Sequence, residues 1–517
     1  MTHGHFWKIM AGGLLLLVGA VPALAQPYDI PVSDGAGIMS ASAPVFRAET
    51  AHEVHIRGQR VRYRVVSGET VLRDLDGAET GRIFAFSYLR TDAVATDRPV
   101  LFVFNGGPGS ASLWLHMGVI GPRRLVLDQE VNPSNVPPFG LTDNPVSVLD
   151  VADLVFIDPV GTGFSRPAPG VDPALFWGVD EDAESIAQFI ELWLTEHGRW
   201  NSPKYVLGES YGTVRAAVLP RALMGSPIYN GVMRGITLDG VILLGTTLAG
   251  RGNGGAPDGE TLAAARARSL PGLAVTAAYH GRSSLETDDP EAVYAAAAAY
   301  ADGPYRAALA DLQAGTLSPS DRAEILAQLE VFVGLDAETI GEDLYISERD
   351  YARTLLTDAG LEAGVYDSRY TLPLASSGRD PVADDPAMGQ YVPGFVSAFN
   401  RMLGEELGVD TGRAYTAIRW RDLLPAWNWE RRGVEPGQSF AVDLAWSMRR
   451  NRDLRVFVAS GYYDLVTTPA DARASISEAG LPEDRVRFEE YPSGHMLYLG
   501  GTAQAFAEDL RTFLTAH

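Results

Sequence analysis

Residues 204–213 read KYVLGESYGT, in which an apolar stretch runs directly into a glycine-flanked serine, Ser210. The next residues, VRAAVLPRALM, can begin a helix. A strand, a sharp turn and a helix in this order place a serine oxygen at the carboxyl edge of a sheet, where it can act as a nucleophile. The alternative is a serine that caps an ordinary strand-to-helix turn. The stretch therefore predicts a nucleophilic Ser210, and it raises the question of why an acid, Glu209, precedes it.

Short apolar runs of the same kind recur along the chain and predict a mainly parallel sheet. Near-continuous apolar strands suit a sheet that helices cover on both faces. The segment after Asp180 repeats apolar residues at helical spacing behind an acidic first turn, so helices alternate with the strands. The runs are 99–109, 152–163, 204–210, 240–247 and 454–461, followed by a strand-like segment at 486–492.

Two earlier segments, 52–68 and 82–90, alternate in the manner of antiparallel strands around the turn signal Asp76-Gly77. Between about 250 and 425 the chain instead becomes Ala-rich and helical, and the strand pattern resumes afterwards. We therefore predict an α/β core formed by residues 26–249 and 426–517, with a helical cap inserted at 250–425. A separate C-terminal domain is disfavoured because residues 426–517 contain pieces that need the first half.

The N-terminus has the pattern of a secretory signal peptide. Lys8 precedes the apolar run IMAGGLLLLVGAVP, and small residues end at Ala25. An uncleaved membrane anchor is the alternative, but the run is shorter than the ~20 residues that a bilayer requires. We expect a signal peptide over residues 1–25, cleavage after Ala25, and a secreted or periplasmic protein that has no membrane attachment after cleavage.

Composition excludes several classes of function. The net charge of −23 disfavours nucleic acid as a partner, because phosphates would be repelled. The chain has no cysteine, which excludes thiol catalysis, disulfides and cysteine metal sites. It shows no metal-ligand spacing and no nucleotide-binding loop, so neither a metal nor another cofactor is expected.

A serine nucleophile needs a histidine base that a carboxylate orients. On a fold of this kind the partners follow the serine in the order acid, then histidine. His495, in YPSGHMLY after a strand-like segment, is the well-placed histidine, whereas His280 lies in the cap and His517 is the last residue.

The acid is predicted at the exit of another strand. Asp464, in FVASGYYDLVTTP, meets this condition, although an Asx-turn would also explain it. Asp443 and Asp453 precede the strand and would lie at the wrong end of the sheet.

Acyl transfer also needs backbone N–H groups for the developing oxyanion. Tyr211, which follows the nucleophile, should provide one. The glycine-rich loop at 105–109 suits the other, because glycine lets the main chain approach a substrate closely.

Several motifs together resemble the serine carboxypeptidase family, peptidase family S10. They are, in chain order, FNGGPGSAS, IDPVGTGFS, GESYGT, GYYDLVTTP and PSGHM, and the resemblance spans roughly residues 80 to 510. It implies an α/β-hydrolase fold with a cap inserted between core strands. It also implies a triad of Ser210, Asp464 and His495, the residues reached above, with Gly107 and Tyr211 as the oxyanion donors.

The resemblance further implies an answer to the question about Glu209. In this family the acid before the serine and the asparagine of NGGPG hold the C-terminal carboxylate of the substrate, and these are Glu209 and Asn105 here. Met496 would line the pocket for the leaving residue. Two carboxyl groups at hydrogen-bond distance repel each other when both are ionised, so one keeps a proton and acidic pH is favoured.

The chain also departs from the family pattern. A tryptophan that commonly precedes the asparagine by two residues is Val103 here, and a second glutamate near the end of the following helix is Val119. The carboxylate clamp is therefore expected to be thinner. His116 either restores a donor or is a surface histidine, and Arg123 and Arg124 either attract an anionic chain end or are solvated.

Three functions compete on this evidence. The first is a secreted serine carboxypeptidase that acts on peptides, the second is a serine esterase or acyltransferase on the same triad, and the third is a binding protein without chemistry. The pair Asn105 and Glu209 favours the first, because an esterase has no need for it. The aromatic residues of AWNWE (426–430), with Tyr462 and Tyr463, either line the pocket or belong to the core.

Overall fold

The computed structural model describes residues 44–126, 131–228, 230–249, 259–376, 378 and 380–516. The predicted signal peptide and His517 lie outside these ranges. Within the described part of the chain, no helix has both the length and the apolar character needed to cross a membrane.

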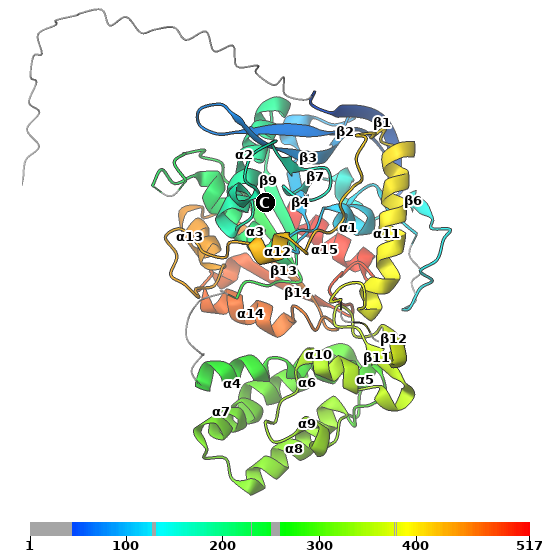
Figure 1. Cartoon of the computed structure of the whole chain (residues 1–517), viewed down its shortest axis with the longest axis vertical. Coiled ribbons are helices and arrows are strands. Elements are labelled where there is room, and N and C mark those ends of the chain that lie inside the picture. The colour runs from blue at the N-terminus through cyan, green and yellow to red at the C-terminus, as the bar shows by residue number, and fades with distance from the viewer. Residues whose placement is uncertain are drawn as a thin grey trace, which may run out of the picture. The chain divides into compact units, whose positions relative to one another are not determined.

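A central β-sheet organises the chain (Figure 1). Its first strands pair antiparallel, and all neighbours from β7 to β14 pair in parallel, in the order β1-β2-β3-β7-β4-β9-β10-β13-β14. With helices on both faces, this is the predicted α/β-hydrolase fold. The strands are β1 (Arg47–Ile56), β2 (Gln59–Arg73), β3 (Glu79–Arg90), β4 (Val100–Phe104), β7 (Asp153–Asp158), β9 (Lys204–Glu209), β10 (Gly240–Leu244), β13 (Arg455–Gly461) and β14 (Val486–Tyr491), and β8 (Arg166–Pro167) pairs with β3.

Every parallel strand predicted from an apolar run is confirmed, but the interpretation of 52–68 as one strand is wrong. The segment contains the turn Arg57-Gly58, which joins β1 to β2 and pairs Ile56 with Gln59. Both turn residues have positive φ, 50° and 77°, as a two-residue hairpin turn requires. The turn lacks the Asn-Gly or Asp-Gly pair that usually signals such hairpins.

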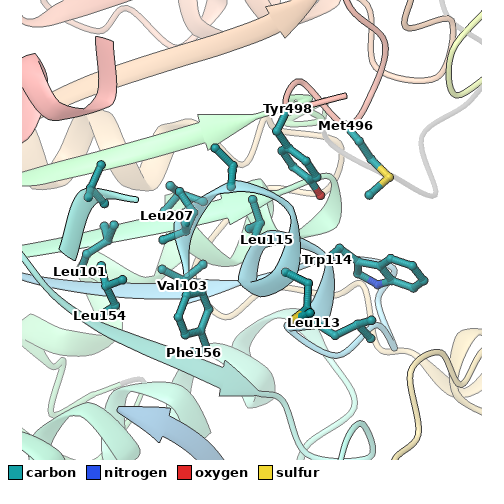
Figure 2. Packing of buried hydrophobic residues seen from close by; sticks show 14 of the residues in the cluster. Leu101, Val103, Leu113, Trp114, Leu115, Leu154, Phe156, Leu207, Met496 and Tyr498 are labelled. Atoms are coloured by element: carbon teal, nitrogen blue, oxygen red, sulfur yellow. The ribbon is translucent and has the colours of Figure 1, made fainter. Parts of the chain in front are cut away.

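The two faces of the sheet bury separate hydrophobic clusters. Along β4, Leu101 and Val103 face one cluster while Phe102 and Phe104 face the other, because side chains alternate along a strand. Figure 2 shows Leu101 and Val103 packed with Leu154, Phe156 and Leu207 from the neighbouring strands. Helices on the first face are α1 (Leu113–Leu115), α11 (Pro386–Glu405) and α15 (Ala503–Thr515); those on the second are α2 (Val179–His197), α3 (Tyr211–Met224), α13 (Val442–Arg450) and α14 (Pro469–Glu478).

The insertion predicted over 250–425 divides into two parts. The first is a set of helices with its own hydrophobic cluster, which also takes in Tyr462 and Tyr463. The second includes α11, whose apolar stripe, with Phe395 and Phe399, packs in the same cluster as the sheet. The helices of the first part are α4 (Gly259–Ala267), α5 (Leu270–Tyr279), α6 (Pro290–Tyr300), α7 (Arg306–Ala314), α8 (Pro319–Val333), α9 (Ala337–Ile340) and α10 (Glu348–Thr354).

The end of the insertion crosses the core as a strap, which we define as residues 415–429. Isolated bridges pair it with the loops that follow β4 and β7, at Ser110↔Ile418 and Gly163↔Thr416. The short helix α12 (Leu423–Ala426) lies within the strap. The smaller pairs β5 (Arg123–Leu125) with β6 (Leu141–Asp143), and β11 (Leu361–Ala363) with β12 (Thr371–Pro373), complete the strands.

A buried arginine joins the elements that carry the serine turn. Arg215 on α3 is fully buried, and its Nε donates to Asp182 Oδ2 on α2 at 2.6 Å. Its Nη1 donates to the carbonyl oxygen of Asn105, in the loop after β4, at 2.7 Å. One side chain therefore fixes α3 and α2 against the glycine-rich loop.

We expect Arg215→Met to lower the free energy of unfolding by about 3–5 kcal/mol, because it leaves the buried Asp182 carboxylate unpaired. The double variant Asp182→Leu/Arg215→Met should recover part of this loss, since it removes the unpaired charge as well. Urea unfolding of the two single variants and the double variant measures the coupling. Additive losses would show that the pair does not contribute as a unit.

Candidate active site

The turn that carries Ser210 is shaped by crowding. Ser210 lies between β9 and α3 with φ 60° and ψ −129°, a strained conformation for a residue with a side chain. A Cβ added at Gly208 would lie 2.0 Å from the carbonyl oxygen of Gly212. A side chain at Gly208 is therefore excluded, and a Cβ at Gly212 would lie tightly, at 3.0 Å, against the carbonyl oxygen of Phe104.

Asp464 and His495 form the hydrogen-bonded pair that the sequence predicts. Asp464 is fully buried, and its Oδ2 lies 2.8 Å from His495 Nδ1. Its Oδ1 accepts the backbone N–H groups of Val466 at 2.8 Å and Thr467 at 2.9 Å. The carboxylate is thus held by the turn after β13 and orients the imidazole, which leaves Nε2 for the serine.

The pKa of His495 is set by opposing effects. Burial disfavours the charged ring, but the charge and hydrogen bond of Asp464, followed by the charge of Glu209, raise the pKa above its usual 6.5. A raised pKa makes the imidazole a better acceptor for the proton of a hydroxyl group. Ser210 and His495 line the same cavity.

The glycine-rich loop lies directly against the serine turn. A Cβ added at Gly106 would lie 2.4 Å from the backbone nitrogen of Tyr211. Gly107 has φ +107°, which favours glycine, and it lines the cavity. Because Tyr211 is the first residue of α3, its N–H has no acceptor within the helix. The two predicted oxyanion donors therefore lie on adjoining segments at one end of the cavity.

Asn105 and Glu209 form a buried hydrogen-bonded pair in the same cavity. Asn105 Nδ2 donates to Glu209 Oε1 at 2.7 Å, and the two residues are only 1% and 5% exposed. The backbone N–H of Leu115 donates to Asn105 Oδ1 at 3.2 Å, which directs the amide nitrogen toward the acid. The sequence pointed to these two residues through the family resemblance, and the fold brings them together.

Glu209 holds a proton more tightly than an ordinary glutamate. Burial raises its pKa from 4.5 to about 7, against the opposing effects of His495, Tyr498 and Asn105. At pH values below about 7 the group is therefore mostly an un-ionised acid, which can donate a hydrogen bond to a carboxylate.

The cavity encloses about 440 Å³ of empty space, part of it open to solvent. The predicted residue Met496 lines it beside Ser210. Its walls also include residues from the insertion and the strap that sequence analysis did not single out. The lining residues are Asn105, Gly106, Gly107, Ser110, Trp114, Glu209, Ser210, Tyr366, Val382, Met388, Ile418, Trp420, His495 and Met496.

A segment of the insertion also braces the triad. The backbone N–H of His495 donates to the carbonyl oxygen of Tyr366 at 2.6 Å. Arg369 pairs with Asp367 and donates through Nη1 to the carbonyl oxygen of Pro492 at 2.8 Å. No local sequence signal marks Tyr366 or Arg369, because their contacts with His495 and Pro492 span more than a hundred positions.

Three residues that sequence analysis linked to the clamp lie elsewhere. His116 is 1% exposed, so it is no surface histidine; its Nε2 lies 2.7 Å from the Tyr88 hydroxyl and its ring stacks on Phe156. Burial lowers its pKa to about 3. Arg123 pairs with Glu406 at 2.8 Å. His116, Arg123 and Arg124 are all absent from the residues that line the cavity.

The aromatic candidates belong to hydrophobic clusters. Trp427 and Trp429 pack edge-to-face on Tyr211, with ring centroids 5.3 and 5.7 Å apart. They therefore support the serine turn from behind. Tyr462 and Tyr463 pack in the helical cluster of the insertion, next to the strand exit that carries Asp464.

Comparison with known proteins gives a partial match to one family. Residues 75–245 match the model of the family described as serine carboxypeptidase. This segment contains the glycine-rich loop and the serine turn, and it ends before Asp464 and His495.

Curated relatives match over similar segments. The chain is 29% identical over 137 residues to serine carboxypeptidase-like 9 of Arabidopsis thaliana, which covers 26% of this chain and 30% of the relative. It is 32% identical over 149 residues to a pheromone-processing carboxypeptidase of Blastomyces gilchristii, which covers 28% of this chain and 21% of the relative. The matches thus span about a third or less of these relatives.

Among solved structures, the peroxisomal α/β-hydrolase of Saccharomyces cerevisiae has a TM-score of 0.35 and 10% identity, over 91% of this chain and 88% of that chain. An epoxide hydrolase of Aspergillus niger has a TM-score of 0.33 and 13% identity, over 87% and 77%. The assignment of the fold rests on strand order and pairing.

The raised pKa of Glu209 predicts a pH-dependent stability. Between pH 4.5 and about 7 the folded chain keeps a proton that the unfolded chain releases, so this group's contribution to stability is lost as pH rises through that window. Glu209→Gln does not titrate. We therefore expect its free energy of unfolding to gain about 3 kcal/mol relative to the wild type between pH 4 and pH 8.

Urea unfolding across this pH range measures the difference between variant and wild type. The matched control is Glu478→Gln at an exposed position on α14, whose effect should stay within about 0.5 kcal/mol. A pH-independent difference for Glu209→Gln would contradict a raised pKa at Glu209.

Proposed function

We propose that this protein is a secreted serine carboxypeptidase that removes the last residue of peptides through an acyl-enzyme on Ser210. The observation that carries the proposal is the buried pair Asn105–Glu209 in the cavity that holds Ser210 and His495. An amide N–H and an un-ionised carboxyl can both donate hydrogen bonds to a carboxylate. A serine esterase needs no such pair next to its nucleophile.

The proposed reaction follows from the positions of these groups. His495 takes the proton of the Ser210 hydroxyl as the serine oxygen attacks the carbonyl carbon before the last residue. The N–H groups of Gly107 and Tyr211 donate to the oxyanion that forms. His495 then gives the proton to the leaving amine, the peptide bond breaks, and water hydrolyses the ester on Ser210 by the same steps.

Glu209 sets the upper limit of the proposed pH range for activity, and His495 sets the lower limit. Glu209 must be protonated to bind a carboxylate, so KM should rise as pH rises through about 7. His495 must be neutral to act as a base, so kcat should fall as pH drops below the pKa of the ring. Protonation of Glu209 removes one of the charges that raise the pKa of His495, which extends activity toward acidic pH.

A blocked dipeptide and its C-terminally amidated twin test the clamp. At pH 6 we expect kcat/KM for the free acid to exceed that for the amide by about 10- to 100-fold, because charge-assisted hydrogen bonds contribute roughly 1.5–3 kcal/mol. Release of the last amino acid or its amide is measured, with Ser210→Ala as the inactive control. Equal cleavage of the twins would instead favour the esterase or acyltransferase alternative.

The same assay, repeated over a range of pH, separates the pH dependence of KM from that of kcat. In Glu209→Gln the rise of KM near pH 7 should disappear, because an amide donates its hydrogen bond at any pH. The fall of kcat at low pH should remain. An unchanged KM profile would remove Glu209 from carboxylate binding.

Export is proposed from residues 1–25, which lie outside the described ranges. If the signal peptide is cleaved after Ala25, the mature chain should begin at Gln26. N-terminal sequencing of the protein recovered from the periplasm or medium of an expressing bacterium checks this. A chain that retains Met1 in the cell would contradict it.

A further inference from the structure

Two buried oxygens near the nucleophile lack partners. Among the residues that the structure describes, neither Glu209 Oε2 nor the Tyr498 hydroxyl has a hydrogen-bond partner. The side chains are buried, at 5% and 2% exposed. A buried polar atom without a partner is costly, so two of them next to a reaction centre require an explanation.

The two atoms belong to neighbouring groups. The hydroxyl of Tyr498 lowers the pKa of Glu209, against the larger effect of burial, and Glu209 adds to the rise that burial causes in the pKa of Tyr498. Glu209 Oε1 is already occupied by Asn105. Oε2 is therefore the carboxyl oxygen left for Tyr498.

The absence of a side chain at Gly118 leaves space for the Tyr498 ring. A Cβ added at Gly118 would lie 2.3 Å from Tyr498 Cε2 and 2.5 Å from Cδ2. Figure 2 shows the Tyr498 ring near Met496, with its hydroxyl end toward the helix that carries Leu115. Gly118 directly precedes Val119, where the family resemblance implies a second glutamate. Gly118 and Tyr498 thus lie next to the position at which the expected second glutamate is missing.

We propose that Tyr498 is a positioning residue for the carboxylate clamp: its hydroxyl, which lies outside hydrogen-bond geometry in this structure, closes onto Glu209 Oε2 as a donor and holds the acid in the orientation that meets the chain end of the substrate. The proposal rests on the proposed carboxypeptidase function. Tyr498 does not line the cavity, so it acts through Glu209 and does not touch the substrate.

The four groups that face Glu209 come from three loops. Asn105 follows β4, Asp464 follows β13, and His495 and Tyr498 follow β14. Asn105 already donates to Oε1, so Tyr498 is the uncharged donor left for Oε2 that takes no part in proton transfer. Removing it should change binding of the carboxylate and leave the Ser210 chemistry in place.

For Tyr498→Phe we expect KM for the free-acid dipeptide to rise about three- to tenfold at pH 6, with kcat within twofold, because one positioning hydrogen bond is lost. The pH at which KM begins to rise should also move upward, since the lost donor had favoured the ionised form of Glu209. A purely structural role would not move this pH. Unchanged KM and an unchanged pH limb would overturn the proposal.

The matched control is Tyr294→Phe, which removes a buried hydroxyl that also lacks a partner among the described residues, in the helical cluster of the insertion. It should leave KM and its pH limb unchanged. In a Glu209→Ala background, Tyr498→Phe should have no further effect on KM, because its effect passes through the acid. An equal effect in both backgrounds would show that Tyr498 acts independently of Glu209.

A measurement without substrate separates this proposal from the proposed function. Infrared difference spectroscopy can follow the protonated carboxyl band that Glu209→Gln removes. Its titration midpoint should rise in Tyr498→Phe and stay unchanged in Tyr294→Phe. If the wild type releases no amino acid but the midpoint rises, the carboxypeptidase function fails while the contact between Tyr498 and Glu209 stands; an unchanged midpoint refutes the contact itself.

Discussion

The parallel register between β4 and β9 is the constraint on which the site depends. Phe104 pairs with Gly208, so the next residues on the two strands, Asn105 and Glu209, leave the sheet side by side. Their side chains meet at 2.7 Å without any adjustment of the loops. The same logic extends across the sheet, where Gly461 pairs with Tyr491 and the turns beyond them carry Asp464 and His495. A slip of one residue in either pair would turn a side chain to the opposite face.

Glycines allow the segments that follow β4 and β9 at this register to pack closely together. The loop after β4 and the turn after β9 approach so closely that a Cβ at Gly106 would meet the backbone of Tyr211 at 2.4 Å. Arg215 then ties this junction to α2, and the Phe104 and Tyr211 rings flank its guanidinium. The candidate nucleophile, the predicted oxyanion donors and the pair Asn105–Glu209 therefore come from one compact junction, which the buried ion pair Arg215–Asp182 joins to α2.

The electrostatic character of the site follows from burial. A low-dielectric cavity disfavours an ionised Glu209, while the buried Asp464 favours a charged His495. Both pKa values are therefore raised, which favours the neutral form of Glu209 and the charged form of His495. The neutral form of Glu209 is the one that the proposed carboxylate binding requires, while Asp464 stays hydrogen-bonded to the imidazole.

The local order of the chain predicted the strands, the serine turn and the candidate residues Ser210, Asp464 and His495, because strand periodicity and turn chemistry are short-range properties. It could not show that α11 packs on the sheet while α4–α10 form their own cluster, since both are helical segments of one insertion with apolar residues to bury. Nor could it place His116 in the core, Tyr366 in the wall of the cavity or Tyr498 next to Glu209. Those placements depend on which segments meet in space, and only the tertiary structure decides contacts between residues hundreds of positions apart.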